Sequence, residues 1–436
     1  MISILRVGLI VFVLLISACG GGGGDPQDDA TTLPRSDVRD VNRLYAYRSN
    51  SEYASVLKQC ALADNNDACT LSTLPFIGQD HPDVSRSDVI DRLLVTHDWM
   101  GERFADFLDD APDDMIELFG SVTSISIGST VRPSFYRSDI GAIRLDPAFL
   151  WLDVEEKASV SIAEDFRSNC GRDLRFFHMF AMLQNGQRAT AFHSLLDYKV
   201  RNFADIRYSL SELMFHELGH AVDYIPLASL GTLDRQLTPG QAKDELAFQR
   251  VSTRLYNDLP LNSNMLYRLA QVRFQCEEAS EDLQALTASD VGIEMAGDGA
   301  SEFYSYSTIR EDMANLMAAS MMKKHFNIDF AIGFSRKPDD VESYRCDELL
   351  MGWGTRNRLV DPLVAPRAKW VVDRVFGFRA DNEQLFASGL GASSDMTPGV
   401  DWCSNVDRGL VASRTRAAQQ ISIEQIMSES GGPRHH

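Results

Sequence analysis

Positive charge is scarce in this 436-residue sequence: 42 lysines and arginines stand against 62 aspartates and glutamates, which gives a formal net charge of −20. This excess of negative charge argues against a nucleic-acid-binding protein and against electrostatic adhesion to anionic lipid. The sequence also has no C-x-x-C pair, which argues against a cysteine zinc site, and no apparent internal repeat. What remains is an ordinary globular composition, 44% hydrophobic and 24% charged, in a chain long enough for one large or two closely packed domains.

Long hydrophobic runs are missing as well, and the apolar stretch Val7–Ile16 is too short for a stable membrane span. Small residues then precede Cys19, and this pattern resembles the signal of bacterial lipoproteins, in which such a cysteine is acylated. Because Gly20 rather than an aspartate follows, the resemblance implies a lipid anchor in the outer membrane. We therefore expect a signal peptide at 1–18 and a flexible tether at 19–37, with an ordinary secretory signal as the alternative.

The other cysteines are few and even in number: Cys60, Cys69, Cys170, Cys276, Cys346 and Cys403. An even number in an exported chain favours disulfides. Cys60 and Cys69 bracket a short polar segment and are the expected pair. The sequence does not assign the other four.

Histidine is rare, with 9 in the chain, yet His216, Glu217 and His220 stand in the order H-E-x-x-H. On a helix, His216 and His220 lie one turn apart on the same face, so both imidazoles can reach one metal ion. Glu217 stands beside the first ligand, where its carboxylate can contact a metal-bound water without binding the metal. The motif predicts one zinc per chain rather than two structural histidines.

The segment that carries the motif, 209–224, has the pattern of a helix. Ser209 and Glu212 are predicted to form an S-x-x-E capping box, and apolar residues recur at helical spacing beside the ligand face. Gly219 does not suit a regular helix. We expect another backbone or a substrate to approach closely at this residue.

A catalytic zinc site takes three protein ligands and leaves one position open. The metzincin pattern is excluded, because Asp223 and Pro226 stand where it requires glycine and histidine. The segment TIREDMANL instead resembles the E-D-x-A segments of gluzincin peptidases, and this resemblance implies Glu311 as the third ligand. Glu302 in the preceding loop is the competitor, and Glu311 is also placed to cap the helix predicted at 308–326.

The neighbours of Glu311 have expected roles that follow from the same comparison. Asn315, one turn further along, or Asp312 would accept a hydrogen bond from a liganding imidazole. The resemblance to gluzincins implies that Tyr304 or Tyr306 donates a hydrogen bond to the tetrahedral oxyanion. Simple packing is the alternative for both tyrosines.

The fold class predicted from the pattern is α+β: a mainly helical, zincin-like catalytic region with a small sheet above the active-site helix. Two strands are predicted at 122–127 and 142–145, separated by a turn-rich stretch, and an edge of their sheet could pair with an extended substrate. Further helices are predicted at 85–108, 244–259, 264–275 and 367–376, and a glycine-rich loop at 292–307.

These elements suggest three regions after the tether. A helical N-terminal region is expected at 38–120, the zincin-like catalytic region at 121–330 and a further helical region at 331–436. Part of the first region, 38–84, is a candidate propeptide that would occlude the cleft.

The sequence therefore predicts a zinc metallopeptidase of the bacterial envelope, in which Glu217 acts as general base on a zinc-bound water. Its expected partners are a peptide or protein substrate and, through the N-terminal anchor, a membrane. Two alternatives stay open: a zinc-binding lipoprotein with a chaperone or binding role and little turnover, and a zinc amidase that acts on cell-wall material.

Overall fold

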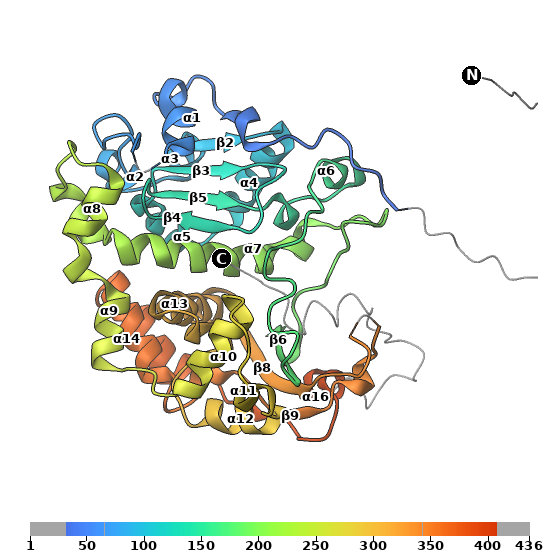
Figure 1. The fold of residues 1–436 in the computed structure, drawn as a ribbon. Helices are drawn as coiled ribbons and strands as arrows, with labels where there is room; N and C mark the ends of the chain where they lie inside the picture. Colours follow the sequence, from blue (N-terminus) through green and yellow to red (C-terminus); the bar gives the residue numbers. More distant parts are fainter. Residues whose placement is uncertain (1–31, 65, 342, 408–436) are drawn as a thin grey trace, which may run out of the picture.

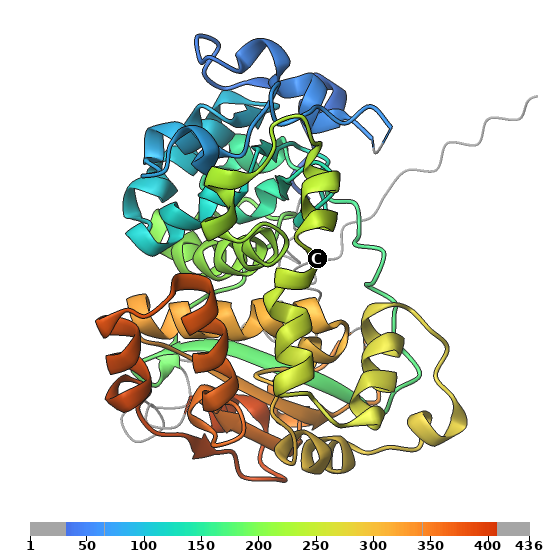
Figure 2. The same ribbon diagram turned by 90° about the vertical axis from the view of Figure 1, so that its left-hand side faces the viewer.

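Two β-sheets lie on opposite sides of a pair of crossing helices, α7 (Phe203–Tyr224) and α13 (Ile309–Phe326), in the computed structural model (Figure 1). The structure describes residues 32–407 apart from 65 and 342. Helix α7 runs across the view of Figure 1 and is seen almost end-on in Figure 2, whereas α13 shows the reverse. The main hydrophobic core includes buried side chains of both helices. This mixed architecture agrees with the predicted α+β class.

The first sheet has the strand order β1-β2-β3-β5-β4. Its strands are β1 (Tyr45–Ala46), β2 (Leu93–Val95), β3 (Ser124–Ile127), β4 (Phe135–Arg137) and β5 (Ala142–Leu145). The three central strands are parallel, and β1 and β4 add antiparallel at the edges. Strands β3 and β5 confirm the two predicted strands, but neither is an edge strand. The edge that contacts α7 is β4, which lies in the stretch predicted to be turns.

The single helix predicted at 85–108 is wrong in its middle. The chain forms α3 (Arg86–Ile90), then β2, then α4 (Asp98–Asp110). The predicted cap at the start is confirmed, since Ser85 and Asp88 form a capping box. All three residues of β2 are fully buried between β1 and β3, and such a short apolar run fits a strand as well as a helix.

The second sheet is entirely antiparallel, with the order β10-β9-β8-β6-β7. Its strands are β6 (Phe176–Gln184), β7 (Gln187–Arg188), β8 (Ile328–Arg336), β9 (Met351–Arg356) and β10 (Ser394–Asp395). The sequence reading missed this sheet, because the pairing of β6 with β8 joins segments about 150 residues apart. The boundary expected at residue 330 falls inside β8, and the region after it is not purely helical.

The predicted start is confirmed for one of the two long helices and wrong for the other. Helix α13 begins after Thr308, as predicted, and ends at Asn327 in the left-handed conformation. Helix α7 begins after Asn202 rather than Ser209, because Asn202 and Asp205 form the capping box. Ser209 is therefore an interior helical residue, and the cap predicted there is wrong.

The remaining helices correct two further predictions. The helix predicted at 244–259 is broken into α8 (Pro239–Glu245) and α9 (Val251–Asp258), and the loop predicted at 292–307 begins inside α12 (Ala288–Ala296). The helices predicted at 264–275 and 367–376 are confirmed as α10 (Asn264–Phe274) and α14 (Ala365–Phe376). The other α-helices are α1 (Ala54–Leu62), α2 (Ile77–Asp80), α5 (Asp113–Leu118), α6 (Val154–Ala158), α11 (Glu281–Gln284), α15 (Ala380–Gln384) and α16 (Trp402–Val406).

Residues 38–120 belong to the same half of the molecule as β3 to β5. They supply β1 and β2 to the first sheet, so the boundary expected at residue 120 divides one sheet. Within 38–84, the side chains of Leu57, Phe76 and Ile77 are fully buried. Removal of this segment would expose core, which argues against a propeptide.

All six cysteines of the described chain form disulfides. The predicted pair Cys60–Cys69 is confirmed, with its Cα atoms 5.3 Å apart. The other two bridges are Cys170–Cys276 and Cys346–Cys403. The predicted signal peptide and Cys19 lie outside the described residues. Within 32–407, no helix is both long and apolar enough to cross a membrane.

Candidate metal centre

The three predicted ligands converge at the crossing of α7 and α13. The Nε2 atom of His216 lies 2.9 Å from Oε2 of Glu311 and 3.2 Å from Nε2 of His220. The third side of this triangle, from His220 Nε2 to Glu311 Oε2, is 3.2 Å. His216 is fully buried and the other two side chains are nearly so. Two imidazole nitrogens and one carboxylate oxygen therefore face a common point.

Local and tertiary structure each contribute to this convergence. The spacing of His216 and His220 places their rings one helical turn apart, with centroids at 4.8 Å. Glu311 comes from the first turn of α13, and Gly219 allows that helix to approach. A Cβ atom at position 219 would lie 3.3 Å from the Cα of Ala314. The close approach expected at Gly219 is thus made by the α13 backbone.

The competing interpretations of Glu311 and Glu302 can be compared directly. The hydroxyl of Thr308 accepts hydrogen bonds from the N–H groups of Arg310 and Glu311, so the cap of α13 is a threonine. The Glu311 carboxylate instead faces the two histidines. Among the described residues, the group of potential metal ligands at the motif contains Glu311 and not Glu302.

The electrostatics of the triangle favour a positive charge at its centre. Burial alone would lower the pKa of His216, but the hydrogen bond and charge of Glu311 outweigh it and raise that pKa to about 9. Burial would raise the pKa of Glu311, and the two imidazoles instead hold it well below its usual range. A buried carboxylate beside two histidines thus requires a proton or a metal cation as its partner.

A zinc ion fits this donor set. Two histidines and one glutamate are ligands of known catalytic zinc sites, and tetrahedral bonds of about 2.1 Å separate ligand atoms by roughly 3.4 Å. The observed separations of 2.9 to 3.2 Å differ from that value by a few tenths of an ångström. The second group of potential ligands, Cys346, Asp401 and Cys403, is unsuitable because its cysteines are joined in a disulfide.

Glu217 lies next to this triangle and is fully buried. It follows the first ligand on α7, and its charge contributes to the raised pKa of both His216 and Tyr304. A carboxylate in this position can accept a proton from a water molecule at the metal without being a ligand itself.

The structure separates the two candidate tyrosines. The ring of Tyr304 stacks on that of His216, with centroids 6.1 Å apart. Burial and the nearby Glu311 charge raise the pKa of Tyr304 well above its usual range, so its hydroxyl stays protonated and can donate. Tyr306 is fully buried and donates instead to Asp298, at 3.0 Å. Of the two tyrosines, only Tyr304 lies beside the candidate ligands.

The two predicted supports of the histidines have other partners. Asp312 is paired with Arg367, with Oδ1 and Nη1 3.0 Å apart. The amide of Asn315 donates to Ser305 at 3.2 Å, and its Oδ1 accepts no hydrogen bond from a described residue. Neither residue therefore orients an imidazole as predicted. Sequence reasoning also missed Arg367, which no local pattern links to a site 55 residues earlier.

No protein-family model, curated protein or solved structure matches this chain. The function is therefore inferred from the residues of the site and from their geometry.

Proposed function

We propose that the protein is a zinc-dependent metallopeptidase of the gluzincin type. The observation that carries the proposal is the convergence of His216, His220 and Glu311, with Glu217 buried beside them. Zinc is the cofactor that this donor set suits best, and it would supply Lewis acidity and an activated water at the open coordination position.

The protein's own residues account for the proton transfers of peptide hydrolysis. Glu217 accepts a proton as the oxygen of water bonds to the peptide carbonyl carbon. It then delivers that proton to the leaving amine as the C–N bond breaks. Tyr304 donates a hydrogen bond to the oxyanion of the tetrahedral intermediate.

The edge strand β4 supports a peptide as substrate. It is the last strand of the first sheet on the side of α7, and Tyr136 on β4 stacks on Tyr224 of α7 with ring centroids 6.0 Å apart. An extended peptide could add to this edge through main-chain hydrogen bonds and so pass near the metal centre. The zincin resemblance implies a small sheet above the motif helix with an edge that can pair with substrate, and β4 takes the place of the strands expected at that edge.

An envelope location is part of the same proposal. Three disulfides in the described chain favour an oxidising compartment. The lipoprotein-like Cys19 would anchor the protein to the outer membrane. Mass spectrometry of the mature N-terminus tests this part, because an unacylated protein that keeps residues 1–18 would contradict it.

Zinc content and hydrolysis together test the catalytic proposal. We expect one zinc per chain in the wild type and in Glu302→Ala, the control, and none in Glu311→Ala. Glu217→Gln should keep its zinc and lose hydrolysis of denatured protein substrates. An active Glu217→Gln protein would refute the mechanism, and a protein without zinc would refute the metal site.

The two alternatives predict different assay results. Hydrolysis of muropeptides but not of denatured protein would favour the cell-wall amidase. Bound zinc without turnover of either substrate would favour the binding or chaperone role.

A further inference from the structure

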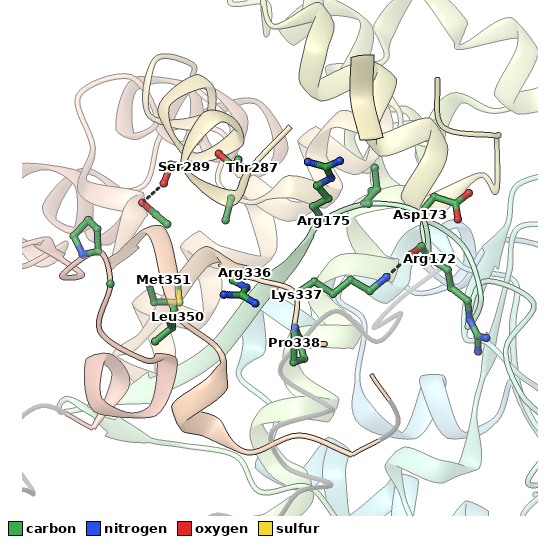
Figure 3. A pocket seen from close by; sticks show the side chains of 15 residues that line it. Arg172, Asp173, Arg175, Thr287, Ser289, Arg336, Lys337, Pro338, Leu350 and Met351 are labelled. Atoms are coloured by element: carbon green, nitrogen blue, oxygen red, sulfur yellow. Dashed lines mark hydrogen bonds between the residues drawn. The ribbon is translucent and has the colours of Figure 1, made fainter. Parts of the chain in front are cut away.

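A cavity lined by cationic side chains lies at one end of the second sheet, away from the metal centre. Its volume is about 730 Å³ (Figure 3). Among the described residues, four cationic side chains line it, Arg172, Arg175, Arg336 and Lys337, together with a single acid, Asp173. None of the residues of the metal centre contributes to its wall. This cavity therefore needs an explanation of its own.

The charge of the cavity is opposite to that of the whole chain, which carries a formal net charge of −20. Within the described residues, Arg172, Arg175 and Lys337 form no salt bridge, and Arg336 has only an exposed one with Asp339. Burial lowers the pKa of Lys337, and the charge of Arg172 lowers it further against the opposing effect of Asp173. Cations gathered without carboxylate partners are mutually repulsive, and an anion between them would relieve that repulsion.

The backbone brings these cations together. Arg175 stands immediately before β6 and Arg336 ends β8, and Lys337 donates through Nζ to the carbonyl of Arg172. Figure 3 shows Arg175 beside Thr287 in the upper part of the view, Arg336 below them, and Lys337 extending toward the backbone of Arg172. The cationic groups thus come from two adjacent strands of one sheet.

The opposite wall is the first turn of α12. Thr287 caps this helix, and Gly352 of β9 lets the strand approach it: a Cβ atom at 352 would lie 2.5 Å from the backbone nitrogen of Ser289. The Asp290 carboxylate completes the capping box and offsets the positive end of the helix dipole, so the field in the cavity comes from the cationic side chains. Apolar side chains, among them Leu174 and Met351, complete the lining, and none of the described residues in it is aromatic.

We propose that this cavity binds a non-aromatic organic phosphate, either free or as a lipid headgroup. Arg175 and Arg336 stand at paired ends of β6 and β8, and arginine's fork suits the oxygens of a phosphate group. The volume is that of a small-molecule site rather than of a bare ion, and the apolar wall would receive the rest of the molecule. The absence of an aromatic ring from the described lining argues against a nucleotide, whose base would stack.

The proposal is independent of peptidase activity, and calorimetric titration with glycerol 3-phosphate tests it. Arg175→Gln/Arg336→Gln removes two cations whose side chains hold no buried partner. Asp173→Asn removes the acid from the same wall. Arg43→Gln, at an exposed position in the other half of the molecule, removes one cation outside the cavity and serves as a control. Phosphate bound at the metal centre would contribute equally in all variants, so differences between them report on the cavity.

We expect the double variant to bind glycerol 3-phosphate at least about tenfold more weakly, because it loses two charge-assisted contacts. Asp173→Asn should bind more tightly than the wild type, a gain that misfolding cannot produce, and Arg43→Gln should bind like the wild type. The proposal would be overturned if the wild type bound neither glycerol 3-phosphate nor vesicles that contain phosphatidylglycerol. Equal binding by the wild type and the double variant would overturn it as well.

The source of the phosphate is decided by cosedimentation with vesicles of phosphatidylcholine that contain phosphatidylglycerol. Cosedimentation that is lost in the double variant identifies a lipid headgroup. Titration by glycerol 3-phosphate without cosedimentation identifies a free phosphate ester.

Discussion

Replacement of Arg367 by methionine should strongly destabilise the protein, because this arginine neutralises the buried residue next to Glu311. Its guanidinium donates to the carbonyls of Leu259 and Gly299, both at 2.9 Å, and to Asp312 Oδ1 at 3.0 Å. Both side chains of the pair are about 5% exposed. Methionine fills much of the same volume but leaves the carboxylate unpaired, a change that costs about 3–5 kcal/mol. A typical domain has only roughly 5–15 kcal/mol of stability to lose.

The loss should depend on pH in a definite direction. Burial already raises the pKa of Asp312 in the presence of Arg367, and removal of the arginine raises it further. A carboxyl group whose folded pKa exceeds its unfolded value of about 3.9 destabilises the protein as pH rises through that folded value. The difference between wild type and Arg367→Met should therefore be largest at neutral pH and smaller near pH 4, where only the lost hydrogen bonds to the Leu259 and Gly299 carbonyls still contribute.

Urea unfolding at several pH values, followed by tryptophan fluorescence, measures this effect. Arg374→Met is the control on the same helix, because Arg374 is exposed and should cost at most about 1 kcal/mol. Arg367→Met/Asp312→Asn should recover part of the stability, since no charge stays unpaired. A loss below about 1 kcal/mol for Arg367→Met, or a loss that shrinks as pH rises, would refute the reasoning.

Four further substitutions test the site and the packing of α13. Tyr304→Phe should lower kcat by about 10²–10³-fold with little change in KM. Tyr306→Phe should keep kcat and lose about 1–3 kcal/mol of stability. Equal kcat values for the two variants would contradict the assignment of different roles to the two tyrosines. Gly219→Ala should weaken zinc binding in a chelator competition, because the added methyl presses on α13 at Ala314; unchanged affinity would show that this contact does not position Glu311. Asp114→Asn should lower the stability by about 1–3 kcal/mol at pH 7, because Asp114 of α5 accepts a hydrogen bond from Lys324 of α13. Burial would raise the pKa of Asp114, but its hydrogen bonds outweigh burial and hold that pKa well below its usual range. That stability is present above about pH 4 and is lost as pH falls, so wild type and Asp114→Asn should converge in acid unfolding.

Local sequence patterns predicted the parts of the protein that depend on residues close in the chain. The positions of His216 and His220 on one helix face follow from the helical period, and the cap at Thr308 needs only the next few residues. Strands β3 and β5 are short segments rich in isoleucine beside turn residues, and they formed where predicted. Each of these features is decided within about one or two turns of chain.

Features that depend on distant partners were not predicted. Strand β2 has a periodicity compatible with a helix, and its place between β1 and β3 decides otherwise. The second sheet needs the pairing of β6 with β8 across most of the catalytic region. Tyr304 and Tyr306 are two residues apart, and only the position of Asp298 shows which of them turns away from the metal centre.

The third candidate ligand depends on a contact between distant segments, unlike the first two. The sequence named His216, Glu217 and His220 outright, because their relation is a property of one helix. It left Glu311 and Glu302 in competition, because no local rule relates α7 to a helix 95 residues later. The tertiary structure favours Glu311: Gly219 lets α13 cross α7 at close range, and this packing places the Glu311 carboxylate 2.9 Å from His216. Contacts between distant segments are set by the packing of whole helices, which single residue patterns do not encode.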